Sequence, residues 1–421
     1  MKIRLKNIVT ASLLMSAVAV YGYDASYYAD RSALSEGRWV KIRVDRNGLY
    51  KIDRETLAEW GFDDPSRVTV YGYGGSRLYT ETFDADLPDD VRPTATMRRD
   101  DGIIFYGEGV LTSRSRSLSS LDISRNIYDR YGYYFITEDG GGTPCGSVRA
   151  GVVQSNASDH HMSAVVIEND IVNPGNGGGV FHDTPMNPGE RRVYSFEITD
   201  FHITSALPPY GIFKYNFGAH NEDGNTKLAI DFPETFKEKF RREGSAQTIR
   251  GETRYYNSAE GYIQVEAASA DALVGRSETV GFGLTLDEST DADYVAVDRT
   301  SFCYPRLNRL GDRDFLELRY AQTITFAISE SDADVYVWDI SDVAAVKPLD
   351  VVYDASSAKT MVRNSGSTPA VMKYMAFRAS GDFMKPEYAG EVRTSNLHGM
   401  PTPEMVIITT GDFVGQAREL A

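Results

Sequence analysis

The fold class is decided by one stretch near the N-terminus, Trp39-Val40-Lys41-Ile42-Arg43-Val44-Asp45-Arg46-Asn47-Gly48-Leu49-Tyr50-Lys51-Ile52. Apolar and charged residues alternate over its first six positions, as they do in a strand with one buried face. Asn47-Gly48 favours a tight hairpin turn, so Leu49-Tyr50-Lys51-Ile52 is predicted to be the partner strand. The stretch therefore predicts antiparallel β structure.

The same alternating pattern continues to about residue 150, and we expect residues 23–150 to form one β-rich domain. A short helix is predicted over residues 54–60, with Asp53 as its N-cap and Gly61 as its C-terminal stop. Further strands are predicted at residues 68–71, 103–107 and 131–137.

Residues 151–395 are predicted to form an antiparallel β-sandwich, because strand-like runs recur there with turn residues between them. The predicted strands are residues 163–169, 193–198, 213–217, 227–232, 261–266, 294–302, 316–328 and 335–338. The last two are expected to close the same sandwich.

Residues 396–421 change in character. Met405-Val406-Ile407-Ile408-Thr409-Thr410 is a continuous apolar run, which favours a strand buried on both faces. After Gly411-Asp412, one helical face would carry Phe413, Ala417, Leu420 and Ala421. Strand, loop and helix form the opening of a βαβ unit. We therefore expect the chain to stop at the start of a truncated, caspase-like α/β domain.

The composition of the chain limits the classes of function that are open to it. The chain has 421 residues, a net charge of −16 and 11% aromatic residues. It shows no cluster of basic residues after its first few positions, which argues against a nucleic-acid partner. Two cysteines far apart in sequence, Cys145 and Cys303, do not form a zinc motif. Either they pair in an oxidising compartment or both stay unpaired and buried.

Residues 1–22 have the layout of a secretory signal peptide. Met1-Lys2-Ile3-Arg4 is basic, residues 8–20 are apolar, and polarity returns at Asp24. Cleavage after Gly22 or after Ala19 fits the pattern. No later segment is long and apolar enough to be a transmembrane helix. We expect an exported protein at the outer membrane surface or outside the cell.

Several segments, taken in order, resemble a known family. They are residues 37–44, 48–52, 57, 61–62, 70–75, 101–107, 126–128, 133–135, 304–307 and 337–342. Asn396-Leu397-His398-Gly399, leading into the apolar run at residue 405 and Gln416-Ala417, is similar to the entry of a gingipain-type peptidase domain. In this order the segments resemble the N-terminal part of PorU-type, gingipain-like cysteine peptidases of the type IX secretion system.

That resemblance implies a parent enzyme that removes C-terminal sorting domains from secreted cargo and attaches the cargo to the cell surface. Its partners would be such cargo proteins and other type IX secretion components. The catalytic His and Cys of that family cannot be assigned to any residue here, so we expect the chain to be inactive by itself. The alternative is a stand-alone exported β-sandwich module that binds protein or glycan.

No residue is assigned to catalysis, to a metal or to a cofactor. His160 and His161 are adjacent in a strand and should point to opposite faces, which suits one metal ion poorly. We expect surface roles for them and for His182 and His202, and a hinge or packing role for His398.

Two other motifs favour structural roles. Asp287, Glu288, Asp291 and Asp293 form an acidic loop without EF-hand spacing, and a solvated turn is the prediction. Gly72-Tyr73-Gly74-Gly75 follows a strand but lacks the Lys-Ser/Thr of a phosphate-binding loop.

Overall fold

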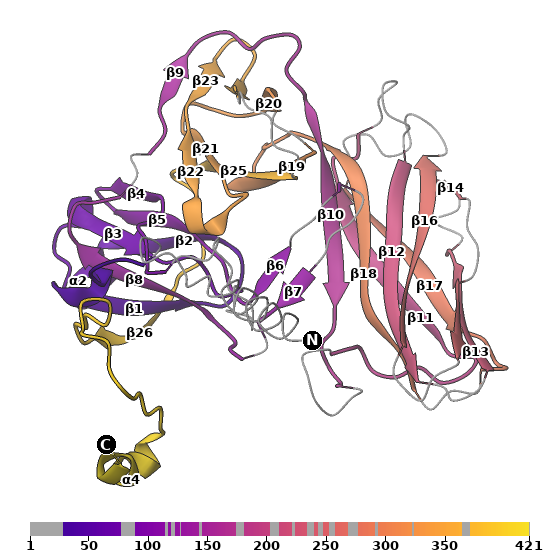
Figure 1. Cartoon of the computed structure of the whole chain (residues 1–421). Coiled ribbons are helices and arrows are strands. Elements are labelled where there is room, and N and C mark those ends of the chain that lie inside the picture. Colours follow the sequence, from indigo (N-terminus) through magenta and orange to yellow (C-terminus); the bar gives the residue numbers. More distant parts are fainter. Residues whose placement is uncertain are drawn as a thin grey trace, which may run out of the picture. The chain divides into compact units, whose positions relative to one another are not determined.

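The computed structural model describes residues 28–76, 89–113, 117–118, 123–126, 128–142, 145–173, 181–202, 210–220, 224–233, 240–242, 247–251, 257–267, 277–290, 294–321, 324–363 and 371–420. The predicted signal peptide lies outside these residues. They separate into two compact units, one from 28–39, 89–92 and 391–420, and one from 40–76 and 93–390. The structure is mainly β, as the sequence predicts (Figure 1).

Two facing sheets make the N-terminal part. One has the order β26-β1-β8-β3 and the other β2-β5-β4. The strands are β1 Trp39–Val44, β2 Gly48–Asp53, β3 Val68–Tyr71, β4 Thr96–Arg99, β5 Gly102–Gly107, β8 Gly132–Glu138 and β26 Glu387–Val392. Side chains from both sheets, such as Ile42, Ile103 and Tyr134, share one hydrophobic core. The apolar residues that alternate along these strands thus face the buried core, as their spacing predicts.

The predicted hairpin at Asn47-Gly48 is wrong, although both of its strands are present. β1 has β26 and β8 as neighbours, and β2 pairs with β5 in the other sheet. The turn therefore leads the chain from one layer to the facing one. Gly48 has φ 152°, and a Cβ there would come within 2.5 Å of Met384 Cε. The glycine thus permits a close approach to the segment before β26.

The predicted helix is confirmed as α2, Arg54–Glu59, but the predicted cap is not. Asp53 occupies the N-cap position without a side-chain hydrogen bond to the helix. Its carboxylate accepts a hydrogen bond from Lys385 Nζ at 2.7 Å instead. An ion pair with a distant lysine has replaced the local capping bond. The short helical turns are η2 Ala33–Ser35, η3 Pro65–Arg67, η4 Val343–Ala345 and η5 Gly411–Phe413.

A β-sandwich follows, as predicted. One sheet has the order β10-β18-β12-β16-β14 and the other β11-β17-β13-β15. The strands are β10 His160–Glu168, β11 Arg191–Thr199, β12 Tyr210–His220, β13 Gly224–Asp231, β14 Phe240–Arg242, β15 Gln247–Gly251, β16 Asn257–Ala267, β17 Ser277–Leu286 and β18 Tyr294–Leu307. Aromatic rings fill the space between the sheets. Phe213 stacks on Phe302 with ring centroids 4.1 Å apart, and Phe282 of the facing sheet lies 5.2 Å from Phe213.

The strands after residue 310 do not close that sandwich, which corrects the prediction for residues 316–328 and 335–338. They form sheets of their own, ordered β19-β25-β21-β22 and β20-β24-β23-β9, around a separate core. The strands are β9 Val148–Ala150, β19 Phe315–Tyr320, β20 Phe326–Ser329, β21 Val335–Asp339, β22 Lys347–Leu349, β23 Val351–Asp354, β24 Lys359–Val362 and β25 Met372–Arg378. A further sheet has two strands, β6 Leu111–Ser113 and β7 Ile123–Arg125.

The smaller unit is held by polar contacts between segments that are distant in sequence. The Ser32 amide donates to Asn396 Oδ1 at 2.9 Å, and the Ser395 amide donates to the Leu34 carbonyl at 3.1 Å. The unit ends in helix α4, Val414–Leu420, which confirms the predicted helix. The strand predicted at residues 405–410 is wrong, because these residues form no β ladder. An apolar run needs a hydrogen-bonding partner strand to become part of a sheet.

Candidate functional site

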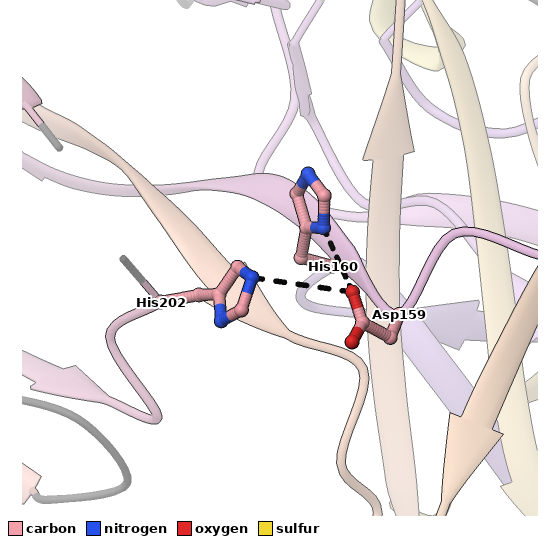
Figure 2. A group of neighbouring side chains, drawn as sticks. All are labelled: Asp159, His160 and His202. Carbon is pink, nitrogen blue, oxygen red and sulfur yellow. Dashed lines mark hydrogen bonds and ion pairs between the residues drawn. The ribbon is translucent and has the colours of Figure 1, made fainter. Parts of the chain in front are cut away.

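Three polar side chains converge where the sandwich begins. Asp159 directly precedes β10, His160 is the first residue of β10, and His202 follows β11. Figure 2 shows both imidazole rings directed toward the Asp159 carboxylate. His160 Nδ1 lies 2.9 Å from Asp159 Oδ1, and His202 Nε2 lies 3.9 Å from the same oxygen.

The backbone around β18 brings these residues together. Arg306 of β18 pairs with His161 of β10 on one edge and bridges Phe201 on the other. The His202 amide then donates to the Pro305 carbonyl at 2.9 Å. Asp200 adopts a left-handed conformation with φ 52°, at the point where the chain leaves the β11 sheet and approaches β18. The two histidines thus lie on elements that flank the same strand.

The group is partly shielded from water. The side chains of His160 and His202 are 24% and 15% exposed, whereas that of Asp159 is 66% exposed. The two imidazole rings lie 4.8 Å apart, centroid to centroid, and are inclined by 30°. Two mostly buried imidazole rings and one solvent-exposed carboxylate therefore form a small polar site that is open to solvent.

The electrostatics of this site favour a neutral imidazole beside an ionised carboxylate. Burial lowers the pKa of His202, the neighbouring His160 lowers it further, and Asp159 opposes both effects. Burial pushes the pKa of Asp159 upward, but the hydrogen bond with His160 and the charge of His202 bring it below its ordinary value. Two imidazole nitrogens and one carboxylate oxygen make a donor set suited to a transition metal ion.

The prediction that His160 and His161 point to opposite faces is confirmed, but the surface role predicted for His161 and His182 is wrong, because both side chains are buried. His160 and His161 do point to opposite faces, since His161 is buried with its Nδ1 2.9 Å from Asn308 Oδ1. Sequence reasoning missed Asp159 and the approach of His202. The only local signal is the Asp-His pair at the start of a strand, because the third member comes from a separate segment.

His182 and His398 are not members of this group. His182 is buried and pairs through its backbone with Val172, and burial lowers its pKa. His398 Nδ1 lies 3.4 Å from Asp89 Oδ2 in the smaller unit. This contact joins two segments of the unit and agrees with the packing role predicted for His398.

Neither cysteine has the properties of a reactive thiol. Both are unpaired, Cys145 half-buried and Cys303 fully buried on β18. Burial raises the pKa of Cys145 to about 11 and also raises that of Cys303. A thiol in such surroundings is almost entirely protonated near pH 7 and is a weak nucleophile.

The acidic loop and the glycine motif have structural explanations. Asp287 Oδ1 accepts hydrogen bonds from the Ser289 amide and hydroxyl at 2.9 and 2.5 Å, which is a local turn. Asp291 and Asp293 lie outside the described residues. At Gly75 a Cβ would come within 2.4 Å of Gly132 Cα, so the glycine motif permits two backbones to pass closely.

A second candidate surface lies at residues 405–420, which we call the C-terminal apolar segment. Its large side chains are exposed: Met405 57%, Val406 69%, Ile408 95%, Phe413 61% and Leu420 70%. No residue of α4 is buried. A groove of about 500 Å³ runs between the extended residues and the helix, lined by Glu404, Met405, Ile407, Val414, Ala417 and Arg418.

The fold defines a mainly β protein built from several packed sheets whose strand pairs are antiparallel, except for the parallel pair of β23 and β9. No protein-family model matches the chain, and no curated protein sequence matches it. Among solved structures, the crystal structure of dimeric latent PorU from Porphyromonas gingivalis is similar, with a TM-score of 0.73 and 21% sequence identity. The similarity covers 93% of this chain and 36% of the PorU chain.

Two other solved structures carry no argument, because their TM-scores are low. They are a structure of infectious bursal disease virus (TM-score 0.20, 7% identity, 85% and 69% of the two chains covered) and the isomalto-dextranase of Arthrobacter globiformis (0.18, 10%, 65% and 36%). The likeness to PorU shows a PorU-like fold. Among the described residues no helix is long and apolar enough to cross a membrane.

Proposed function

We propose that this chain is the N-terminal, non-catalytic region of a PorU-like, gingipain-type cysteine endopeptidase and sortase. In this proposal its β sheets support a separate catalytic α/β domain, which the C-terminal apolar segment contacts. The observation that carries the proposal is the exposure of that segment in a chain whose PorU-like fold spans 36% of the PorU chain.

Solvent exposure on this scale is unfavourable for a folded surface. Five large apolar side chains within residues 405–420 are more than half exposed. Contiguous apolar surface of this kind marks a contact with another protein part. A run such as Met405-Val406-Ile407-Ile408 becomes buried when strands pair on its edges and helices cover its faces. The α/β domain of a gingipain-type peptidase supplies both, and we propose it as the occupant.

The chemistry of the two thiols is the reason for assigning catalysis to a separate domain. A cysteine peptidase needs a thiolate with a low pKa beside a base. Burial raises the pKa of both cysteines here, so in this proposal the nucleophile and base belong to the catalytic domain. The whole enzyme would process the C-terminal sorting domains of type IX secretion cargo and attach the cargo at the cell surface.

Amide hydrogen exchange tests the contact. We expect fast exchange across residues 405–420 in the isolated chain, because nothing covers this segment there. Adding a gingipain-type catalytic domain, in trans or fused after residue 421, should slow exchange in this segment. Ile408→Asp should abolish the protection, whereas Val152→Asp, at a site 77% exposed on another part of the chain, should leave it intact.

Two results would overturn the proposal. One is slow exchange across residues 405–420 in the isolated chain, since the segment would then be satisfied without a partner. The other is unchanged exchange after the catalytic domain is fused. Cooperative folding together with binding of a protein or glycan by the isolated chain would instead favour the alternative, a stand-alone surface module.

A further inference from the structure

We propose that Asp159, His160 and His202 bind one divalent transition metal ion, Zn²⁺ above all, through a carboxylate oxygen and two imidazole nitrogens. The site does not depend on the proposed function, because all three ligands lie on strands of the sandwich or directly next to them. No other group of three or more His, Cys, Asp or Glu side chains among the described residues is arranged to hold a metal ion.

The distances fit the ion after small movements. One ligand atom from each residue lies within 4.8 Å of the other two. Zinc binds nitrogen and carboxylate oxygen at about 2.0–2.2 Å, which in a tetrahedral site separates the ligand atoms by roughly 3.4 Å. The 2.9 Å from Asp159 Oδ1 to His160 Nδ1 and the 3.9 Å to His202 Nε2 lie on either side of that value. The third distance, between the two imidazole nitrogens, is at most 4.8 Å, so binding also requires rotation of the His160 and His202 rings toward each other.

The two imidazoles are positioned by backbone pairing. His160 pairs with Leu307 at the end of the long β10–β18 ladder, and the His202 amide bonds to Pro305 two residues earlier on β18. The Asp159 carbonyl accepts a hydrogen bond from the Asn308 amide at 2.8 Å. Because a ladder pair or a backbone hydrogen bond to β18 or the residue after it holds each of the three backbones, less conformational entropy is lost when the ion binds.

The exposure of the three side chains suits a site that is open on one side. His160 and His202 are 24% and 15% exposed, so both imidazole rings are held mostly inside the fold. Three protein ligands leave a further coordination position toward solvent, where the Asp159 side chain is 66% exposed. Water or a group from a partner can fill that position.

Direct metal titration tests the site. The untagged chain is freed of metal with a chelator and then titrated with ZnCl₂ alone by calorimetry, with the bound metal quantified after dialysis. We expect one Zn²⁺ per chain and a higher melting temperature in its presence, because the ion binds the folded state only. Co²⁺ at the same site should give the visible absorption of tetrahedral coordination.

Three ligand variants and one control make the test specific. His160→Ala, His202→Ala and Asp159→Asn should each weaken Zn²⁺ binding by at least roughly 100-fold, because losing a direct ligand should cost no less than losing an outer-shell partner does. His398→Ala, which removes a histidine from the other unit, should bind as the parent does. The melting temperature of each variant in EDTA reports whether it has folded.

Absence of stoichiometric Zn²⁺ binding to the parent chain would overturn the proposal. The same conclusion would follow if folded His202→Ala bound Zn²⁺ as tightly as the parent. In either case the three residues would form only a hydrogen-bonded surface group.

Discussion

At the scale of single residues, one strongly perturbed carboxyl group is Glu168, the last residue of β10. Burial raises its pKa to about 7, and the nearby Asp170 and Asp298 add to this, whereas Arg299 and Arg125 oppose it. Glu168 Oε2 has no hydrogen-bond partner among the described residues. The folded chain therefore retains a proton that the unfolded chain releases at lower pH.

This asymmetry predicts how stability varies with pH. The ordinary pKa of 4.5 applies to the unfolded state, so the folded state binds more protons between pH 4.5 and about 7. The free energy of unfolding should therefore fall across that window and stay lowered above it. Glu168→Gln should remove this dependence and be more stable than the parent at pH 8. After discounting for partial exposure, we expect about 1–2 kcal/mol.

Urea unfolding at pH 5 and pH 8 measures the effect. At pH 5 Glu168→Gln and the parent should have nearly equal free energies of unfolding. A variant that is less stable than the parent at pH 8 would contradict the prediction, because the ionised Glu168 would then be stabilising.

Substitution of Asp200 should cause a large loss of stability. Its side chain is 5% exposed, and its carboxylate lies 2.7 Å from Arg313, 3.5 Å from Arg309 and 3.7 Å from Arg306. Asp200→Ala should lower the free energy of unfolding by about 3 kcal/mol, because it leaves the largely buried Arg306 guanidinium without its counter-charge. Asp231→Ala is the control, since its exposed pair with Arg191 should contribute less than about 1 kcal/mol. Equal losses in urea unfolding would refute the distinction.

At the scale of secondary-structure elements, the sandwich depends on aromatic packing between its sheets. Phe213 of β12 is fully buried and contacts Phe302 within its own sheet and Phe282 across the core. The neighbouring Tyr262 of β16 is 63% exposed on the outer face. Alternation along strands decides which ring is buried, because successive side chains point to opposite faces.

Paired substitutions on these strands measure that difference. Phe213→Ala should lower the free energy of unfolding by about 3–5 kcal/mol, because it leaves a cavity in the core. Tyr262→Ala should change it by less than about 0.5 kcal/mol. Chemical denaturation followed by near-ultraviolet circular dichroism monitors the aromatic core. A Tyr262→Ala loss as large as that of Phe213→Ala would show that the outer face is covered.

At the scale of the whole molecule, the C-terminal apolar segment contributes little to the isolated chain. Residues 405–410 form no ladder, and α4 buries no residue. Truncation after residue 400 should therefore leave the calorimetric melting temperature unchanged, while it keeps the contacts of Ser395 and Asn396. A fall of several degrees would mean that the segment packs on the rest of the chain. That result would weaken the proposed role as a docking surface.

Prediction from the sequence succeeded where the physical cause is local. The alternation at Trp39–Val44 identified β1, the flanking residues identified α2, and the helical spacing of apolar residues identified α4. It failed at Asn47-Gly48, where the choice between a hairpin and a crossing to the facing sheet depends on strands far along the chain. It failed at Asp53 because Lys385, which binds its carboxylate, is remote in sequence.

The sequence by itself determined that this protein is mainly β, where most strands lie and which side chains alternate between core and surface. These properties follow from side-chain periodicity over a few residues. Only the tertiary structure decided which strands share a sheet, that strands β19 to β25 and β9 surround a core of their own, and that His202 lies beside Asp159 and His160. Such contacts join residues that are distant in the chain, and their energies depend on the packing of the whole fold.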